Sequence, residues 1–135
     1  MSVTDTALAV SLAIQNGELL SRADELLADE FVYTGAAGLV LDKAGYIGFM
    51  HGLSQSFSDQ AMTFHATVTE GDKVAVSWTN GMTHTAEYQG IPATGRRITA
   101  SGNWIRQVTD GKVVREWDTT DIFGLMQQLG AFDQH

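Results

Sequence analysis

Two stretches in the C-terminal half of the chain carry side chains that could form one site together. In each stretch the residues of interest alternate along the chain, so in a β-strand their side chains would point to the same face. The two sets are Trp78, Asn80, Met82, His84 and Trp117, Thr119, Asp121. An aromatic wall with a few convergent polar groups is typical of a small-molecule site. A carboxylate in such a wall could act as a general acid or base.

Turn signals predict how these strands pair. Gly71-Asp72 and Asp110-Gly111 each lie between two alternating runs, which indicates tight hairpins. Counting back from these turns gives three opposed pairs: Trp104 with Trp117, Ala100 with Asp121, and His65 with Trp78. If both sets face inward, one pocket receives three tryptophans, two histidines, an amide, a thioether and one carboxylate.

We assign the pocket carboxylate to Asp121, and two alternatives stay open. A single β-bulge inverts the facing of every residue beyond it, and bent sheets use bulges. In that case Asp118 and Asn103 would replace Asp121 on the pocket face. Asp121 also directly precedes Ile-Phe-Gly-Leu, where aspartate is a preferred helix N-cap.

Motifs for metals and common cofactors are missing from the chain. The four histidines show no metal-ligand spacing and there is no cysteine, so we expect no metal site. His51 and His135 are expected to lie in solvent. The stretch from Gly90 to Arg96 lacks the lysine and hydroxyl residue of a phosphate loop. No nucleophilic serine elbow and no dinucleotide fingerprint is present, and we expect no cofactor.

Composition points to one globular domain spanning residues 1–135. The chain is 44% apolar and has a formal net charge of −8. This acidity disfavours nucleic acid and anionic membranes as partners, because both attract clustered Lys and Arg. No apolar run approaches the ~20 residues that span a bilayer, and the N-terminus does not resemble a signal peptide. A cytoplasmic protein is therefore expected.

The order of elements predicts an α+β fold. The first third of the chain reads as helical, with a short strand around Phe31–Tyr33 and a helix capped by Asp42 that carries Tyr46 and Phe49 on its apolar side. From Met62 onward the residue pattern alternates with a period of two, as in the strands of an antiparallel meander. A last short helix is expected over 121–128. Helices followed by a meander place the helices on one face of a single sheet.

Four stretches, read together, resemble the SnoaL-like polyketide cyclases of the nuclear transport factor 2-like superfamily. They are Glu70–Trp78, Thr83–Arg97, Asp110–Asp118 and Asp121–Gly130. The resemblance implies a strongly bent antiparallel sheet wrapped around the N-terminal helices, forming a cone with a deep apolar pocket. It also implies a homodimer.

The resemblance further implies an activity. Similar enzymes close a ring in polyketide methyl esters by intramolecular aldol condensation without a cofactor, and an aspartate placed as Asp121 is here acts as the general acid and base. We therefore expect a cofactor-independent enzyme acting on a small hydrophobic carbonyl compound. Asp121 would move the proton, and His84 or Asn80 would donate a hydrogen bond to the enolate oxygen.

The substrate-binding wall is expected to combine residues of the sheet with two residues from the N-terminal half. Its members are Trp78, Asn80, Met82, Trp104, Trp117, His65, Phe49 and Tyr33. The chain departs from the family at Tyr33-Thr34, where members often carry a histidine, and at Gln107, where they often carry an arginine. A non-catalytic binding module for a hydrophobic ligand therefore stays open, as do isomerase, hydroxylase and epoxide hydrolase chemistries.

Overall fold

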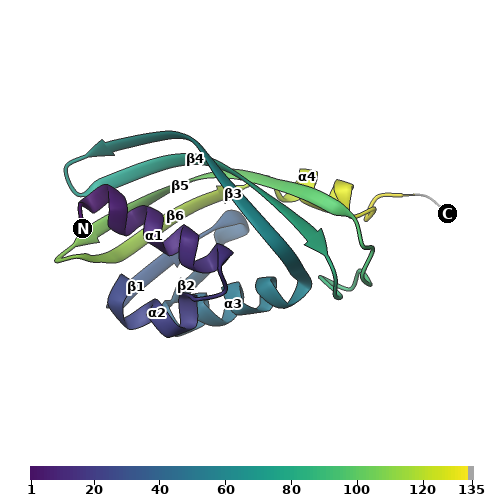
Figure 1. Ribbon diagram of the computed structural model, residues 1–135, viewed down its shortest axis with the longest axis horizontal. Helices are drawn as coiled ribbons and strands as arrows, with labels where there is room; N and C mark the ends of the chain where they lie inside the picture. Colours follow the sequence, from purple (N-terminus) through teal and green to yellow (C-terminus); the bar gives the residue numbers. More distant parts are fainter. Residues whose placement is uncertain (134–135) are drawn as a thin grey trace.

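The computed structural model describes residues 1–133, and Figure 1 shows a long curved sheet with helices packed against its inner side. The helices are α1 (Val3–Gln15), α2 (Leu19–Leu26), the short 3-10 turn η1 (Ala36–Gly38), α3 (Lys43–Ser56) and α4 (Ile122–Gln128). The strands are β1 (Leu27–Thr34), β2 (Val40–Asp42), β3 (Phe57–Glu70), β4 (Lys73–His84), β5 (Arg97–Thr109) and β6 (Lys112–Thr120). His135 lies outside the described residues.

All six strands form one sheet in the order β2-β1-β6-β5-β4-β3. Neighbours from β3 to β6 are antiparallel, as the turn signals predict. Strand β1 instead runs parallel to β6, so the sheet is mixed rather than wholly antiparallel. Parallel neighbours need a long connection, and most of the chain lies between these two strands. The α+β class with a bent sheet around the N-terminal helices is confirmed.

Local sequence explains the turns and caps that set this arrangement. The side chain of Asp42 accepts a hydrogen bond from the backbone N–H of Gly45 and caps α3 as expected. The β5–β6 hairpin turns at Asp110-Gly111, where both residues have positive φ (51° and 77°). This is the backbone that a two-residue type I′ turn requires. The hairpin therefore begins in the register that the sequence predicts, with Thr109 opposite Lys112.

A β-bulge then changes the register of that hairpin one residue further along. Val108 pairs with Val113, but Gln107 pairs with Arg115, so Val114 has no partner across the ladder. Every residue of β6 beyond the bulge consequently faces the side opposite to the one that simple counting predicts.

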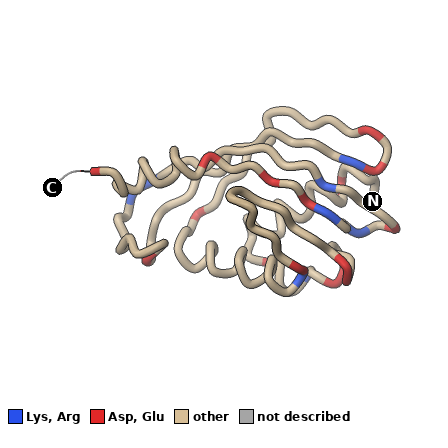
Figure 2. Tube along the Cα trace, turned by 180° about the vertical axis from the view of Figure 1, so that it is seen from behind, with Lys and Arg blue, Asp and Glu red and all other residues tan. Residues whose placement is uncertain are grey.

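Two apolar clusters fill the inside of the curved sheet. The larger one joins α1, α2 and α3 to the β1, β4, β5 and β6 strands, and it includes the fully buried Val10, Tyr46 and Val74. The smaller one lies toward α4, around Phe57, Ile98 and Leu129. Acidic and basic residues are interspersed along the trace in Figure 2, and many lie at the end of the molecule near the N-terminus.

Candidate functional site

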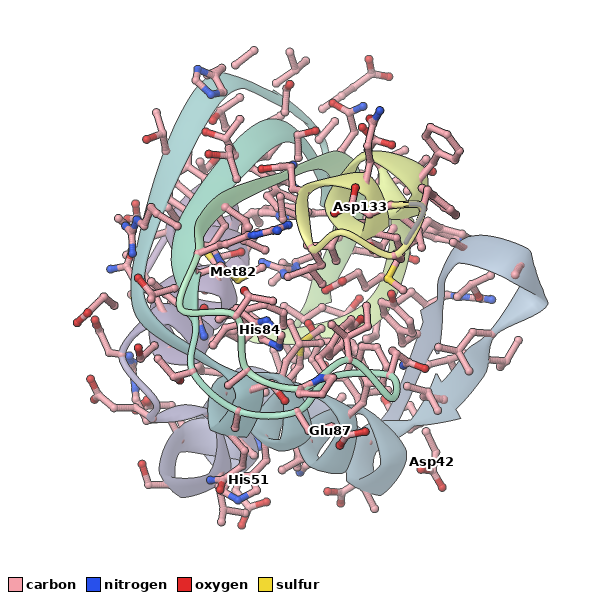
Figure 3. The ribbon with its side chains drawn as sticks, turned by 90° about the vertical axis from the view of Figure 1, so that its right-hand side faces the viewer. Asp42, His51, Met82, His84, Glu87 and Asp133 are labelled. Carbon is pink, nitrogen blue, oxygen red and sulfur yellow. The ribbon has the colours of Figure 1, made fainter. Side chains whose placement is uncertain are left out.

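A cavity of about 240 Å³ opens between the inner face of the sheet and helices α1 and α3. Figure 3 shows the molecule from the right-hand side of Figure 1, with Met82 and His84 inside the curve of the sheet and His51 outside it. Six of the residues predicted for the site line this cavity: Tyr33, Phe49, Trp78, Asn80, Met82 and Trp104. The lining is mostly apolar, as a pocket for a small hydrophobic molecule requires.

Asp118 is the carboxylate on the cavity wall that is not held in an ion pair. It lies on the inner face of β6, directly opposite Trp104. The Tyr33 hydroxyl (3.1 Å) and the Thr120 hydroxyl (2.7 Å) both donate to Asp118 Oδ2. Among the described residues Oδ1 has no hydrogen-bond donor. Burial raises the pKa of Asp118, although the two hydroxyl donors oppose that rise.

The Tyr33 hydroxyl is a stable donor in this arrangement. Burial and the neighbouring carboxylates raise the pKa of Tyr33 far above its ordinary value, so the phenol stays protonated. The side chain is 4% exposed. Asp118 Oδ2 is therefore held in place, while Oδ1 remains available for chemistry.

A buried ion pair forms the floor of the cavity. Arg106 Nε lies 2.6 Å from Glu116 Oε1, and both side chains are 2% exposed. The Tyr46 hydroxyl donates to the same carboxylate oxygen at 3.0 Å. The other end of the guanidinium donates to the Ala7 carbonyl and the Ser11 hydroxyl, each at 2.7 Å. No atom of this pair is buried without a partner among the described residues, as burial of two charges demands.

This pairing determines the charge near Asp118. Arg106 also lies with its guanidinium 3.8 Å from the centre of the Trp104 ring. Among the described residues no Arg106–Asp118 salt bridge forms, because Glu116 already neutralises the arginine. Among the described residues Asp118 is therefore the carboxylate of the wall that has no ion-pair partner.

The opposite wall, on β4, carries two polar atoms without partners. The Asn80 amide nitrogen donates to Gln60 Oε1 at 3.1 Å, but Asn80 Oδ1 is buried and unpartnered among the described residues. Trp78 Nε1 is buried and unpartnered as well. Its ring lies across Gly102, where a Cβ atom would come 2.9 Å from Trp78 Cζ2. The glycine therefore lets the indole extend across β5 toward β6.

His84 is buried beside the cavity but is not part of its lining. Its Nδ1 accepts a hydrogen bond from the Thr94 backbone N–H at 3.2 Å, which places the proton of the neutral ring on Nε2. That Nε2 has no partner among the described residues, and the ring packs against Phe57. These hydrogen bonds hold the His84 ring in place behind the residues that line the cavity.

Three sequence predictions about facing are wrong. Asp121 is exposed and accepts from the Gly124 backbone N–H at 2.9 Å, as the N-cap of α4. Trp117 lies on the outer face of β6, below the Arg115 guanidinium. His65 is exposed and contacts the Thr79 hydroxyl. The bulge in β6 inverts the first two, and a second register shift in β3, between Phe64 and Ala66, displaces the third.

Sequence reasoning missed the ion pair and the hydroxyl donor Thr120. Arg106 alternates with the inward residues Trp104 and Val108, so its parity alone indicated an inward arginine. Charged residues are nevertheless assigned to the surface by default, because they are rarely buried without a partner. Among residues 1–133 no cluster of His, Asp and Glu could hold a metal ion. The described helices are all too short or too polar to cross a membrane.

Comparison with known proteins identifies relatives of this fold. A family model described as SnoaL-like polyketide cyclase matches residues 5–129. IdmH of Streptomyces antibioticus, a proposed polyketide cyclase, is 27% identical with a TM-score of 0.85, over 96% of this chain and 99% of that chain. AclR of Streptomyces galilaeus, a proposed hydroxylase, is 24% identical with a TM-score of 0.86, over 96% of both chains.

A more distant structural relative shares the fold. An epoxide hydrolase of the LEH-like type from M. tuberculosis is 15% identical with a TM-score of 0.73, over 94% of this chain and 88% of that chain. A comparison with curated proteins gives no significant match. At such low identity the epoxide hydrolase, like AclR, establishes the shared fold and nothing about the reaction.

Proposed function

The chain belongs to the SnoaL-like polyketide cyclase family, and on that premise we propose that it is a cofactor-independent enzyme that moves protons on a hydrophobic carbonyl compound. The observation that carries this proposal is the environment of Asp118. Its Oδ2 is held by two hydroxyl donors, its Oδ1 has no partner among the described residues, and burial raises its pKa. A carboxylate with a raised pKa is a better general base near neutrality.

The reaction that fits is an intramolecular aldol closure. Asp118 Oδ1 takes a proton from the carbon next to a carbonyl group, and an enolate forms. The enolate carbon then attacks a second carbonyl carbon of the same molecule, which makes a C–C bond and an alkoxide. The protonated Asp118 returns its proton to that alkoxide. Atoms and charge balance without any co-reactant.

Trp78 supplies the hydrogen bond that we expected from His84 or Asn80. The Asn80 amide nitrogen already donates to Gln60, and His84 does not line the cavity. Trp78 Nε1 is a buried donor without a partner among the described residues, and its ring lies across Gly102 toward β6. A preorganised N–H in an apolar cavity stabilises developing charge on an enolate oxygen. The homodimer expected from the sequence stays a prediction.

Proton exchange tests this proposal without the natural substrate. We expect the wild-type protein to accelerate exchange of the acidic C1 protons of 2-tetralone, a hydrophobic ketone, in D₂O as followed by proton NMR. The Asp118→Asn variant keeps an oxygen for Tyr33 and Thr120 but removes the base. It should lose the acceleration by about 10²- to 10⁴-fold.

Asp121→Asn is the matched control, because Asp121 caps α4 outside the cavity. It should exchange like the wild type. Retained exchange in Asp118→Asn, or lost exchange in Asp121→Asn, would contradict the assignment of the base. Binding of 2-tetralone without any exchange would favour the non-catalytic binding module instead.

A further inference from the structure

Asn80 presents an unpartnered acceptor inside the cavity. The residue is 5% exposed and belongs to the cavity lining. Its amide nitrogen donates to Gln60 Oε1 at 3.1 Å and lies 3.9 Å from Met82 Sδ, which is a weak acceptor. Both contacts engage the nitrogen, and neither involves the amide oxygen. Oδ1 is left buried, with no hydrogen-bond donor among the described residues.

A buried carbonyl oxygen without a donor destabilises the folded chain. The surroundings do not relieve it, because Met82 and Ala100 lie beside Asn80 in the sheet and both are buried apolar residues. A leucine or methionine at this position would pack in the same space with no unpartnered group. The amide is therefore explained by a ligand that supplies the missing donor.

The pairing of strands gives the distance between this acceptor and the proposed base. Asp118 pairs with Trp104, Trp104 pairs with Val76, and Asn80 follows Val76 by four residues along β4. With strands ~4.8 Å apart and a rise of ~3.3 Å per residue, the two Cα atoms lie roughly 16 Å apart along a flat sheet. The curvature of the sheet shortens this distance across the cavity. One ligand of several rings could span it.

We propose that Asn80 Oδ1 binds a hydroxyl group of the ligand, at the end of the cavity away from the reacting carbon. A neutral hydroxyl fits because a cationic donor would lie unpaired in an apolar wall, where burying a charge is unfavourable. The substrate class is then a hydroxylated, multi-ring carbonyl compound. The identity of the reacting end rests on the function proposed for Asp118, but the hydroxyl site itself does not.

Three naphthalene derivatives of similar size test the site by isothermal titration calorimetry. 2-Naphthol donates and accepts hydrogen bonds, 2-methoxynaphthalene only accepts, and 2-methylnaphthalene does neither. We expect the wild-type protein to bind 2-naphthol about tenfold more tightly than either of the others. The Asn80→Leu variant should bind all three within about twofold of one another. The Asn103→Leu variant, changed on the exposed outer face of β5, should keep the wild-type preference.

None of these probes contains a carbonyl group, so none can undergo the proposed aldol reaction and their binding is independent of turnover. If the protein does not prefer 2-naphthol but still exchanges the protons of 2-tetralone, the hydroxyl site is overturned and the proposed function stands. If it prefers 2-naphthol but does not exchange the protons, the hydroxyl site stands and the proposed function is overturned. Equal binding of the three probes, no binding of any, or tighter binding of 2-methoxynaphthalene would overturn the proposal. If Asn80→Leu does not fold by circular dichroism, the smaller Asn80→Ala takes its place and should likewise bind the three probes within about twofold of one another.

Discussion

The floor of the cavity and its β4 wall are buried to a similar depth but differ in how their polar groups are satisfied. On the floor, Arg106 and Glu116 are each 2% exposed, and among the described residues no atom of the pair is buried without a partner. On the wall, Asn80 is 5% exposed, yet its Oδ1 has no donor among the described residues. Trp78 Nε1 shares that property.

This difference separates groups that hold the fold from groups that await a ligand. A satisfied buried network fixes the positions of the elements around it, whereas removal of one member leaves a charge without compensation. An unsatisfied buried group lowers stability and is retained where function needs it. The floor also serves the site indirectly, because Glu116 keeps Arg106 from pairing with Asp118.

The largest effect is expected on the floor. Arg106→Met removes the cation and leaves Glu116 buried and unpaired, so we expect the free energy of unfolding to fall by about 3–5 kcal/mol. Urea denaturation followed by circular dichroism measures this. Arg22→Met is the matched control, because Arg22 pairs with Glu25 at the surface and that change should be worth at most about 1 kcal/mol. If the free energy of unfolding falls by the same small amount in both variants, the proposed difference between the floor and the wall is wrong.

A smaller effect is expected at the exposed carboxylate of α4. Asp121→Ala removes the N-cap hydrogen bond to Gly124, so unfolding should become easier by about 1 kcal/mol. Exchange of 2-tetralone protons should remain at the wild-type rate. Differential scanning calorimetry and the NMR exchange assay measure the two quantities. If the variant had wild-type stability but no longer exchanged the 2-tetralone protons, Asp121 would have to be reassigned to the catalytic site.

The smallest effect, and one of opposite sign, is expected at Asp118. Because its folded-state pKa is raised, the native chain binds more protons than the unfolded chain between the ordinary and the raised pKa. Stability should therefore fall as the pH rises through that window. Asp118→Asn lacks this decline and should be slightly more stable than wild type at pH 7. Urea denaturation from pH 4 to pH 7 compares the two, and a wild-type advantage at pH 7 would show that the ionised carboxylate stabilises the fold.

Local sequence patterns were enough to predict the fold class and both tight hairpins. Asp-Gly at positions 110–111 favours its turn through local backbone conformation, so no distant residue is needed to predict it. The N-cap at Asp42 is equally local. The parallel pairing of β1 with β6 was not predictable in this way, because it joins residues separated by most of the chain.

The sequence predicted the residues of the candidate site correctly only where the strand register follows a simple count from the turns. Trp78, Asn80 and Met82 lie on β4, where alternation is unbroken, and all three line the cavity. Beyond the bulge in β6 the assigned carboxylate was wrong by three residues, and the alternative Asp118 lies on the wall. A bulge adds one residue without a distinctive side chain, and Val114 is an ordinary strand residue. The sequence therefore offered no signal that would choose between the two aspartates.

The unpaired Val114 also bears on how this protein could change over evolutionary time. Deleting that single codon would let β6 pair without a bulge and would leave every later pair in register, so Asp118 would still lie opposite Trp104 on the inner face. The strands, hairpin and helices could all persist, and the inner surface would keep its carboxylate. Within this fold the extra residue thus lets β6 lose one codon without losing the reactive group, whereas straightening the bulge at full length would turn Trp117 and Thr119 inward and Asp118 toward solvent.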